Sequence, residues 1–121
     1  MSGPTQSGLA PNVLAALAYV AWWVTGLAVL ALDRDHPFVR FHAWQSVIGL
    51  GALWALGVAF YFTAFLVLSV SAAGFTAMLW IAVIIWLIGL VAWIVCLLKA
   101  WNGQWWKLPV VGAVAERYAL P

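Results

Sequence analysis

Charged residues are what this sequence has least of. Of its 121 residues only 7% are charged, five of them basic and three acidic, whereas 68% are hydrophobic. An average soluble domain is about a quarter charged and needs polar side chains to cover its surface. A water-soluble globular enzyme and a disordered chain are therefore both excluded. The net charge of +2 is also too small for a nucleic-acid footprint, so no nucleic-acid partner is expected.

Groups that could carry redox, metal or catalytic chemistry are equally scarce. The single cysteine, Cys96, has no second cysteine with which to form an internal disulfide. The two histidines, His36 and His42, are too few for a zinc site, which needs three or four converging ligands. The sequence contains no recognisable nucleophile–base pair or pair of catalytic carboxylates. We therefore expect no catalytic residues, no metal site and no enzymatic activity.

Long uncharged runs are what the sequence has in abundance, and their lengths predict the membrane spans. Residues 13–32 would form a helix of about 30 Å, which is one bilayer crossing. Residues 43–98 would form a helix of about 84 Å, which is too long for a single crossing. The only polar, turn-forming stretch inside that run is residues 69–74. Because both runs are apolar on all sides and lack alternation, helices are expected rather than strands.

The predicted fold is thus an all-α integral membrane protein, in which residues 1–121 form a single transmembrane domain. It has three transmembrane helices and a cytoplasmic interfacial C-terminal tail, over residues 13–32, 43–68, 75–98 and 99–121 respectively. The basic residues all lie between the first two helices or after the third: Arg34, Arg40, Lys99, Lys107 and Arg117. The positive-inside rule then predicts a bacterial inner (cytoplasmic) membrane protein with its N-terminus outside and its C-terminus in the cytoplasm.

Two patterns within the predicted spans suggest contacts with other helices or with a cofactor. Small residues recur at every fourth position of the second helix, as Gly51, Ala55, Ala59 and Thr63. Such a face lets another helix approach closely, either from this chain or from a partner subunit. The ten tryptophans are the second pattern. They either fill space and mark the membrane interfaces or line a contact with a large apolar cofactor or pigment.

The polar stretch around the start of the second helix contains the candidate site residues. His42 is expected to form a structural hydrogen bond near the helix start, with the alternative that it ligates a (bacterio)chlorophyll. Glu116 is expected to pair with Arg40 or Lys107, because the predicted topology places all three on one side of the membrane.

The motif Phe-Val-Arg-Phe-His-Ala-Trp-Gln-Ser at residues 38–46, with Lys-Leu-Pro at 107–109 and Ala-Glu at 115–116, resembles a known family. Its members are small, uncharacterised prokaryotic multi-pass membrane proteins, distantly similar to the channel-forming translocon component of chloroplast protein import. The resemblance implies a multi-helix inner-membrane protein without known catalytic activity. The residues that carry the family signature are Arg40, His42, Gln45 and Glu116.

Three functions remain compatible with this sequence. The leading hypothesis is a non-enzymatic accessory or assembly subunit of a larger membrane protein complex, with lipid and other membrane subunits as its partners. The second is a small subunit of a photosynthetic or respiratory complex, in contact with bacteriochlorophyll, carotenoid or quinone through a partner. The third, which the resemblance suggests, is a translocation or channel-like component.

Overall fold

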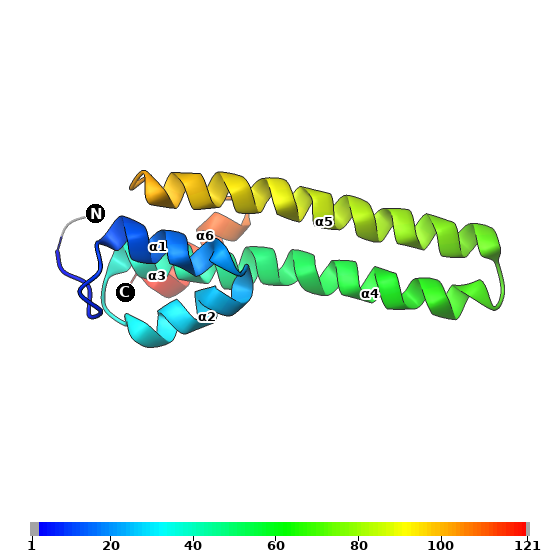
Figure 1. Ribbon diagram of the computed structural model, residues 1–121, viewed down its shortest axis with the longest axis horizontal. Helices are drawn as coiled ribbons and strands as arrows, with labels where there is room; N and C mark the ends of the chain where they lie inside the picture. Colours follow the sequence, from blue (N-terminus) through cyan, green and yellow to red (C-terminus); the bar gives the residue numbers. More distant parts are fainter. Residues whose placement is uncertain (1–2, 121) are drawn as a thin grey trace.

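The computed structural model describes residues 3–120, and this part of the chain is all-helical, as predicted. Its elements are α1 (Pro11–Val20), α2 (Trp23–Leu32), α3 (Pro37–Gln45), the π-helical turn η1 (Ser46–Leu50), α4 (Gly51–Leu68), α5 (Ala72–Trp101) and α6 (Val111–Ala119). The molecule is elongated, with α4 and α5 lying antiparallel along its length (Figure 1). The remaining elements gather around one end of this pair.

Two long helices are apolar enough to cross a membrane. One runs without interruption from Pro37 to Leu68 through α3, η1 and α4, and the other is α5. Only 17% of the most apolar window of each helix is buried inside the protein, which is unlike the core helices of soluble proteins. The turn predicted at residues 69–74 is confirmed, because α4 ends at Leu68 and Ser71 caps the N-terminus of α5. Both helices extend several residues beyond the predicted spans 43–68 and 75–98.

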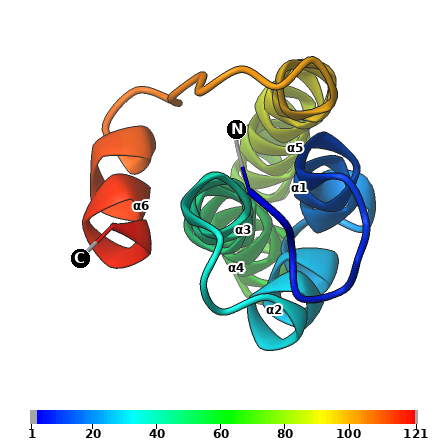
Figure 2. The same cartoon turned by 90° about the vertical axis from the view of Figure 1, so that its left-hand side faces the viewer.

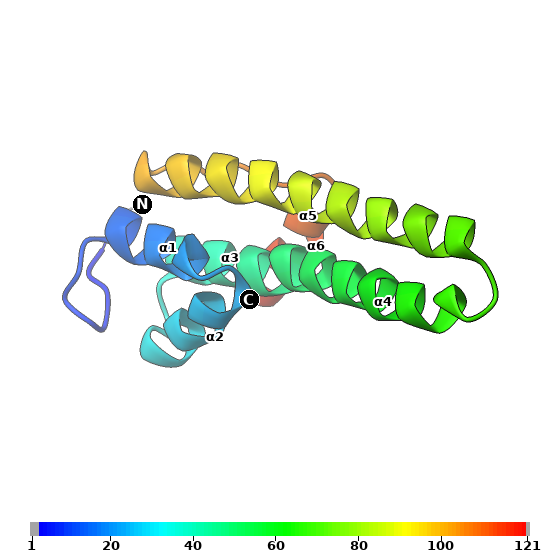
Figure 3. The ribbon, with the colours of Figure 1, turned by 45° about the vertical axis from the view of Figure 1, so that its right-hand side comes forward.

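The prediction of a third span over residues 13–32 is wrong. This run breaks at Ala21 and Trp22, and α2 folds back along α1 to form a helical hairpin (Figures 1 and 3). Each helix has 10 residues, so each is about 15 Å long, half of what a crossing requires. Sequence length alone cannot distinguish one long apolar helix from two short ones.

The break is possible inside an apolar environment because other parts of the chain satisfy the backbone groups that it exposes. The Ser46 hydroxyl donates to the carbonyl oxygen of Trp22, 2.7 Å away, and the backbone N–H of Ala21 donates to the Thr25 hydroxyl at 3.0 Å. Trp22 itself has a φ of +55°, which side-chain-bearing residues rarely adopt. Its ring lies against Gly89 of α5, where any side chain would collide with it. Surrounding contacts therefore hold the turn in place.

Because α1 and α2 form a hairpin, the N-terminal segment lies beside the end of α5. The Asn12 side chain donates to the carbonyl oxygen of Trp101 at 2.9 Å, which places the start of α1 beside the end of α5. The backbone N–H of Gln6 donates to the Asp33 carboxylate in the α2–α3 loop, also at 2.9 Å. The N-terminal segment and the C-terminal tail thus lie at the same end of the molecule (Figure 3). The predicted placement of the two on opposite sides of the membrane depended on a third crossing over residues 13–32, where the structure has two short helices instead.

The tail after α5 forms a second hairpin, which consists of the extended segment before Val110 and of α6. It runs antiparallel to the last turns of α5, beginning with a hydrogen bond from the Gln104 N–H to the Lys99 carbonyl at 2.9 Å. It reverses at Val110, which has a φ of +65°, and α6 returns to pack on α3 (Figure 2). Within the described residues, Trp22 and Val110 are the only non-glycine positions with positive φ. Both mark the inner tip of a hairpin.

The tips of both hairpins contact the same segment of the Pro37–Leu68 helix, the π-helical turn η1 and its neighbours. A side chain at Gly49 would lie 3.0 Å from Val111 of the tail, and one at Gly51 would lie 3.4 Å from Trp23 of the first hairpin. The small residues of this turn therefore allow both hairpins to approach the long helix closely. This region, with its neighbours from α1, α3 and α5, also contains most of the buried core.

Candidate functional site

A cluster of three buried polar side chains lies at the junction of α1, α3 and the tail. Tyr19, His42 and Gln45 are all fully buried. The Tyr19 hydroxyl lies 2.7 Å from Nδ1 of His42 and accepts a hydrogen bond from the Gln45 amide at 3.0 Å. Since α3 carries both His42 and Gln45 on its inner face, three residues from two helices form one network.

This cluster attaches the tail to the long helix. His42 Nε2 donates to the carbonyl oxygen of Gln104 at 2.9 Å, which assigns the acceptor role at Nδ1 and leaves Tyr19 as its donor. The Gln45 amide donates to the carbonyl oxygen of Trp106 at 3.1 Å, and its side-chain oxygen accepts from the Leu108 N–H at 2.9 Å. The polar groups thereby satisfy backbone groups of an extended segment that has no helical hydrogen bonds of its own.

The environment of His42 bears on its predicted role as a pigment ligand. Both ring nitrogens are engaged by protein groups, and the ring is surrounded by Tyr19, Phe38 and Phe41 in edge-on contacts. A metal-centred pigment would have to displace Tyr19 or the tail to reach either nitrogen. The geometry therefore favours the structural role that was expected for His42.

The four signature residues, Arg40, His42, Gln45 and Glu116, all contact the tail or α6. The predicted pairing of Glu116 with Lys107 is confirmed as a salt bridge across the tail turn. Arg40 does not join that pair, and its guanidinium donates instead to the carbonyl oxygen of Tyr118 at 3.1 Å. That carbonyl lies at the C-terminal end of α6, where a positive charge interacts favourably with the helix dipole.

Sequence reasoning missed two participants in these contacts. Tyr19 was given no role, although a polar side chain inside a long apolar run is a signal that it has a partner. The second is Asp33, whose buried carboxylate accepts hydrogen bonds from the backbone N–H groups of Gln6, Asp35 and His36 at 2.9–3.2 Å. Burial by itself raises the pKa of this carboxyl, but these hydrogen bonds outweigh burial and hold the pKa of Asp33 below its ordinary value.

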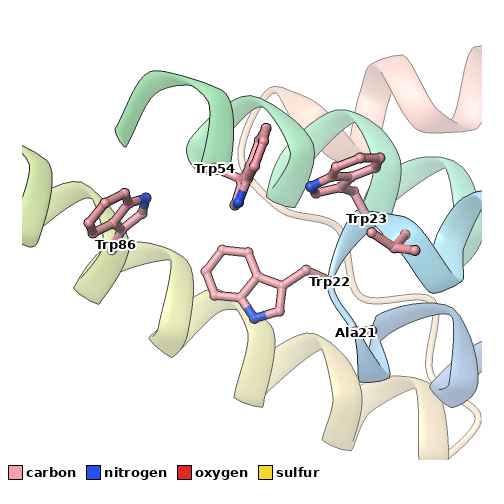
Figure 4. Close-up of a pocket in the computed structure, with 6 residues that line it drawn as sticks. Ala21, Trp22, Trp23, Trp54 and Trp86 are labelled. Atoms are coloured by element: carbon pink, nitrogen blue, oxygen red, sulfur yellow. The ribbon is translucent and has the colours of Figure 1, made fainter. Parts of the chain in front are cut away.

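A second candidate site lies where the first hairpin turns. A cavity of about 510 Å³ is lined by Ala21, Trp22, Trp23, Val24, Trp54 and Trp86. Figure 4 shows the indole rings of four tryptophans from α2, α4, α5 and the turn arranged around it, with the nitrogens of Trp54 and Trp86 on facing sides. The Nε1 of Trp86 is buried and has no hydrogen-bond partner in the described chain. We name these four rings the tryptophan pocket.

The stripe of small residues on α4 is divided between two environments. Gly51 is half-buried beside Trp23, so this position does pack against the chain's own first hydrophobic segment. Ala55, Ala59 and Thr63 are exposed, because α5 packs instead on the α4 face that carries Gly57 and Ala64. Most of the stripe is therefore available for contacts outside the chain.

Comparison with known proteins identifies the family. Residues 8–115 match the MamF/MmsF family, described as the magnetosome magnetite crystal formation protein family. The chain belongs to this family. A UPF0132 membrane protein of Archaeoglobus fulgidus is 36% identical over 107 residues, covering 88% of this chain and 92% of the relative. One from Methanocaldococcus jannaschii is 36% identical over 117 residues, covering 97% and 96%.

A relative with a more informative name is similar over most of its length. The magnetosome protein MmsF of Paramagnetospirillum magneticum is 36% identical over 112 residues, covering 91% of this chain and 90% of that protein. No solved structure matches the chain. The expected resemblance to small prokaryotic membrane proteins is thus confirmed as membership of the MamF/MmsF family. The further likeness to a chloroplast import translocon receives no support from these relatives.

Proposed function

We propose that this member of the MamF/MmsF family is a non-enzymatic accessory or assembly subunit that docks on a larger membrane protein complex. The observation that carries the proposal is the shape of the α4–α5 pair. The other elements all lie along one half of it, and the other half projects alone (Figures 1 and 3). Ala55, Ala59 and Thr63 of α4 are exposed on this pair. Small residues in that arrangement favour close packing of a further helix in lipid, where apolar surface alone gives little driving force for association.

The family supports an accessory role in coarse terms. Its description refers to formation of magnetite crystals in magnetosomes, and MmsF is named as a magnetosome protein, whereas the archaeal relatives are described only as membrane proteins. None of these descriptions names a reaction that the relatives catalyse. The buried polar groups described above serve the fold, since they bind the tail rather than facing an open pocket.

The decisive experiment is isolation of a tagged copy at native expression level in mild detergent, followed by native gel electrophoresis and mass spectrometry. The wild-type chain is expected in a complex well above its own mass of 13.2 kDa. Ala59→Phe, which fills the exposed stripe, is expected to release it. Val83→Phe, at an exposed position of α5, serves as the matched control and should keep the complex. A wild-type species of 13 kDa, with no other protein bound, would refute the proposal.

One observation favours a second candidate function, contact with an apolar cofactor. The tryptophan pocket offers aromatic faces and at least one indole N–H without a partner in the described chain. A carotenoid, quinone or pigment held partly by a neighbouring subunit would fit such a surface. Absorption bands beyond those of tryptophan in the purified complex, lost in Trp54→Leu, would establish this function. A spectrum identical to that of the apoprotein would exclude it for pigments and carotenoids, and extraction with liquid chromatography would do so for quinones.

A further inference from the structure

Two apolar grooves lie next to each other on the face of α5 that the first hairpin does not cover. The first, of about 510 Å³, runs along α5 and is lined by Ile84, Ile88, Val91 and Val95 together with Trp106 and Leu108 of the tail. The second, of about 320 Å³, lies between α4 and α5 and continues to the tail tip. They share Ile88, Ala92 and Leu108, so these three side chains lie where the two grooves adjoin.

One positive charge stands at the polar end of the first groove. Lys99 follows Val95 by four residues on α5, so it continues the row of groove-lining side chains at the end where the helix leaves the membrane. Lys99 is half-buried, and no salt bridge within residues 3–120 engages it. Trp106, which lines the same groove, supplies an indole of the kind that anchors at the headgroup layer.

The acidic groups of this end are already occupied by other partners. Glu116 pairs with Lys107, Asp33 accepts three backbone N–H groups, and Asp35 accepts from the side chain of Gln6 at 2.6 Å. The Lys99 charge is therefore left for a ligand from outside the described chain. An ammonium group near two adjoining apolar grooves matches the phosphate and the two acyl chains of one glycerophospholipid.

We propose that Lys99, Trp106 and the two grooves beside Leu108 form a binding site for one anionic glycerophospholipid of the leaflet at the basic end. The phosphate binds the Lys99 ammonium, and the acyl chains lie in the two grooves. A helix of a second copy is a poorer occupant, because the acidic side chains of that copy are engaged in the same internal contacts and leave no carboxylate for Lys99. The inference does not depend on the accessory role proposed above.

Native mass spectrometry of the full chain tests the site. The protein is released from detergent micelles containing equal amounts of phosphatidylglycerol and phosphatidylethanolamine. The wild-type chain is expected to retain one phosphatidylglycerol in preference to phosphatidylethanolamine. Lys99→Ala should reduce that preference by about fivefold, the effect of one basic residue near an anionic surface. Lys99→Arg should preserve it, and Arg117→Ala, an exposed cation on α6, is the matched control that should leave it unchanged.

A second variant tests the grooves without touching the charge. Ala92 borders both grooves and is half-buried, so Ala92→Phe is expected to fill them and reduce the lipid adduct for both headgroups. Circular dichroism and gel filtration verify that each variant is folded. Equal retention of the two lipids by the wild type, or an unchanged adduct in both Lys99→Ala and Ala92→Phe, overturns the proposal. So does displacement of the adduct by millimolar inorganic phosphate, or a lipid-free dimer.

Discussion

The Trp93 indole of α5 donates a hydrogen bond to the carbonyl oxygen of Tyr19, 2.5 Å away, at the point where α1 ends. The same carbonyl also accepts from the backbone N–H of Trp22. A side chain of α5 thus satisfies a backbone acceptor at the break in the first hydrophobic segment. Without the indole, this carbonyl would keep only backbone N–H groups of the turn as partners, and an apolar environment offers no water to add to them.

Trp93→Phe should therefore destabilise the hairpin. The substitution keeps an aromatic ring but removes the N–H group, and we expect a loss of about 1 kcal/mol in the free energy of unfolding. In detergent this corresponds to a fall of a few degrees in the melting temperature. Trp80→Phe is the control, because Trp80 is 62% exposed and donates to no group in the described chain. Equal melting temperatures for the two variants would contradict the role given to Trp93.

Gln45→Leu should free the tail while leaving most of α3 packed. The change preserves the volume of the side chain but removes the hydrogen bonds to Trp106 and Leu108. The Leu108 amide is expected to exchange its hydrogen about tenfold faster or more, which corresponds to about 1.4 kcal/mol of lost protection. Hydrogen exchange with mass spectrometry reads this directly. Gln104→Leu provides the comparison, since its side chain is exposed and only its backbone contacts the cluster.

Two glycines of α4 should respond in opposite ways to alanine. A methyl group at Gly57 would overlap the Trp86 indole, so Gly57→Ala should push α4 and α5 apart at a cost of about 1–3 kcal/mol. A methyl at Gly51 meets only ordinary contacts at 3.4 Å, and Gly51→Ala should be neutral or stabilising because alanine favours helix. Thermal unfolding in detergent measures both. Comparable losses would show that the spacing of α4 and α5 is not determined at Gly57.

The attachment of the N-terminal segment should weaken in acid. Because the pKa of Asp33 is lower in the folded state than in the unfolded chain, its stabilising effect is complete above the unfolded value, near pH 4. It is lost as the pH falls through the folded value, when the protonated carboxyl no longer accepts charge-assisted hydrogen bonds. Protease cleavage within residues 3–10 should therefore increase below about pH 4 in the wild type. Asp33→Ala should be cleaved equally at pH 3 and pH 7, and a steep pH dependence in this variant would implicate another group.

The hairpin also predicts a topology that single-cysteine labelling can test. Cysteines placed at Ser7 and Asn102 should react from the same side of the membrane, which we propose is the cytoplasm, and one at Ser69 from the other side. Cys96 is buried and contributes little background. Labelling of Ser7→Cys together with Ser69→Cys from one side would restore three crossings and contradict the structure.

The sequence was sufficient to predict the parts of this fold that depend on local patterns. The turn at residues 69–74 follows from a polar break between apolar runs, and the pairing of Glu116 with Lys107 follows from the scarcity of charges. These features need no knowledge of distant contacts. The fold class follows equally from the length of uncharged chain.

The break at Trp22 could not be predicted in the same way, because nothing local requires it. Residues 13–32 contain no proline, and Gly26 lies after the turn rather than in it. The turn depends on donors and space supplied by residues far along the chain, such as Ser46, Trp93 and Gly89. The contacts between the polar cluster and the tail could not be predicted for the same reason, since Gln45 and Leu108 are brought together only by folding.

The gathering of the shorter elements around one half of the α4–α5 pair has a mechanical consequence. The basic end is wide because the shorter elements surround the pair there, whereas the end at the α4–α5 turn consists of the pair alone (Figures 1 and 3). Such a tapered inclusion displaces more lipid area from one leaflet than from the other. Bilayers that contain many copies should therefore bend, with the leaflet at the basic end on the convex side.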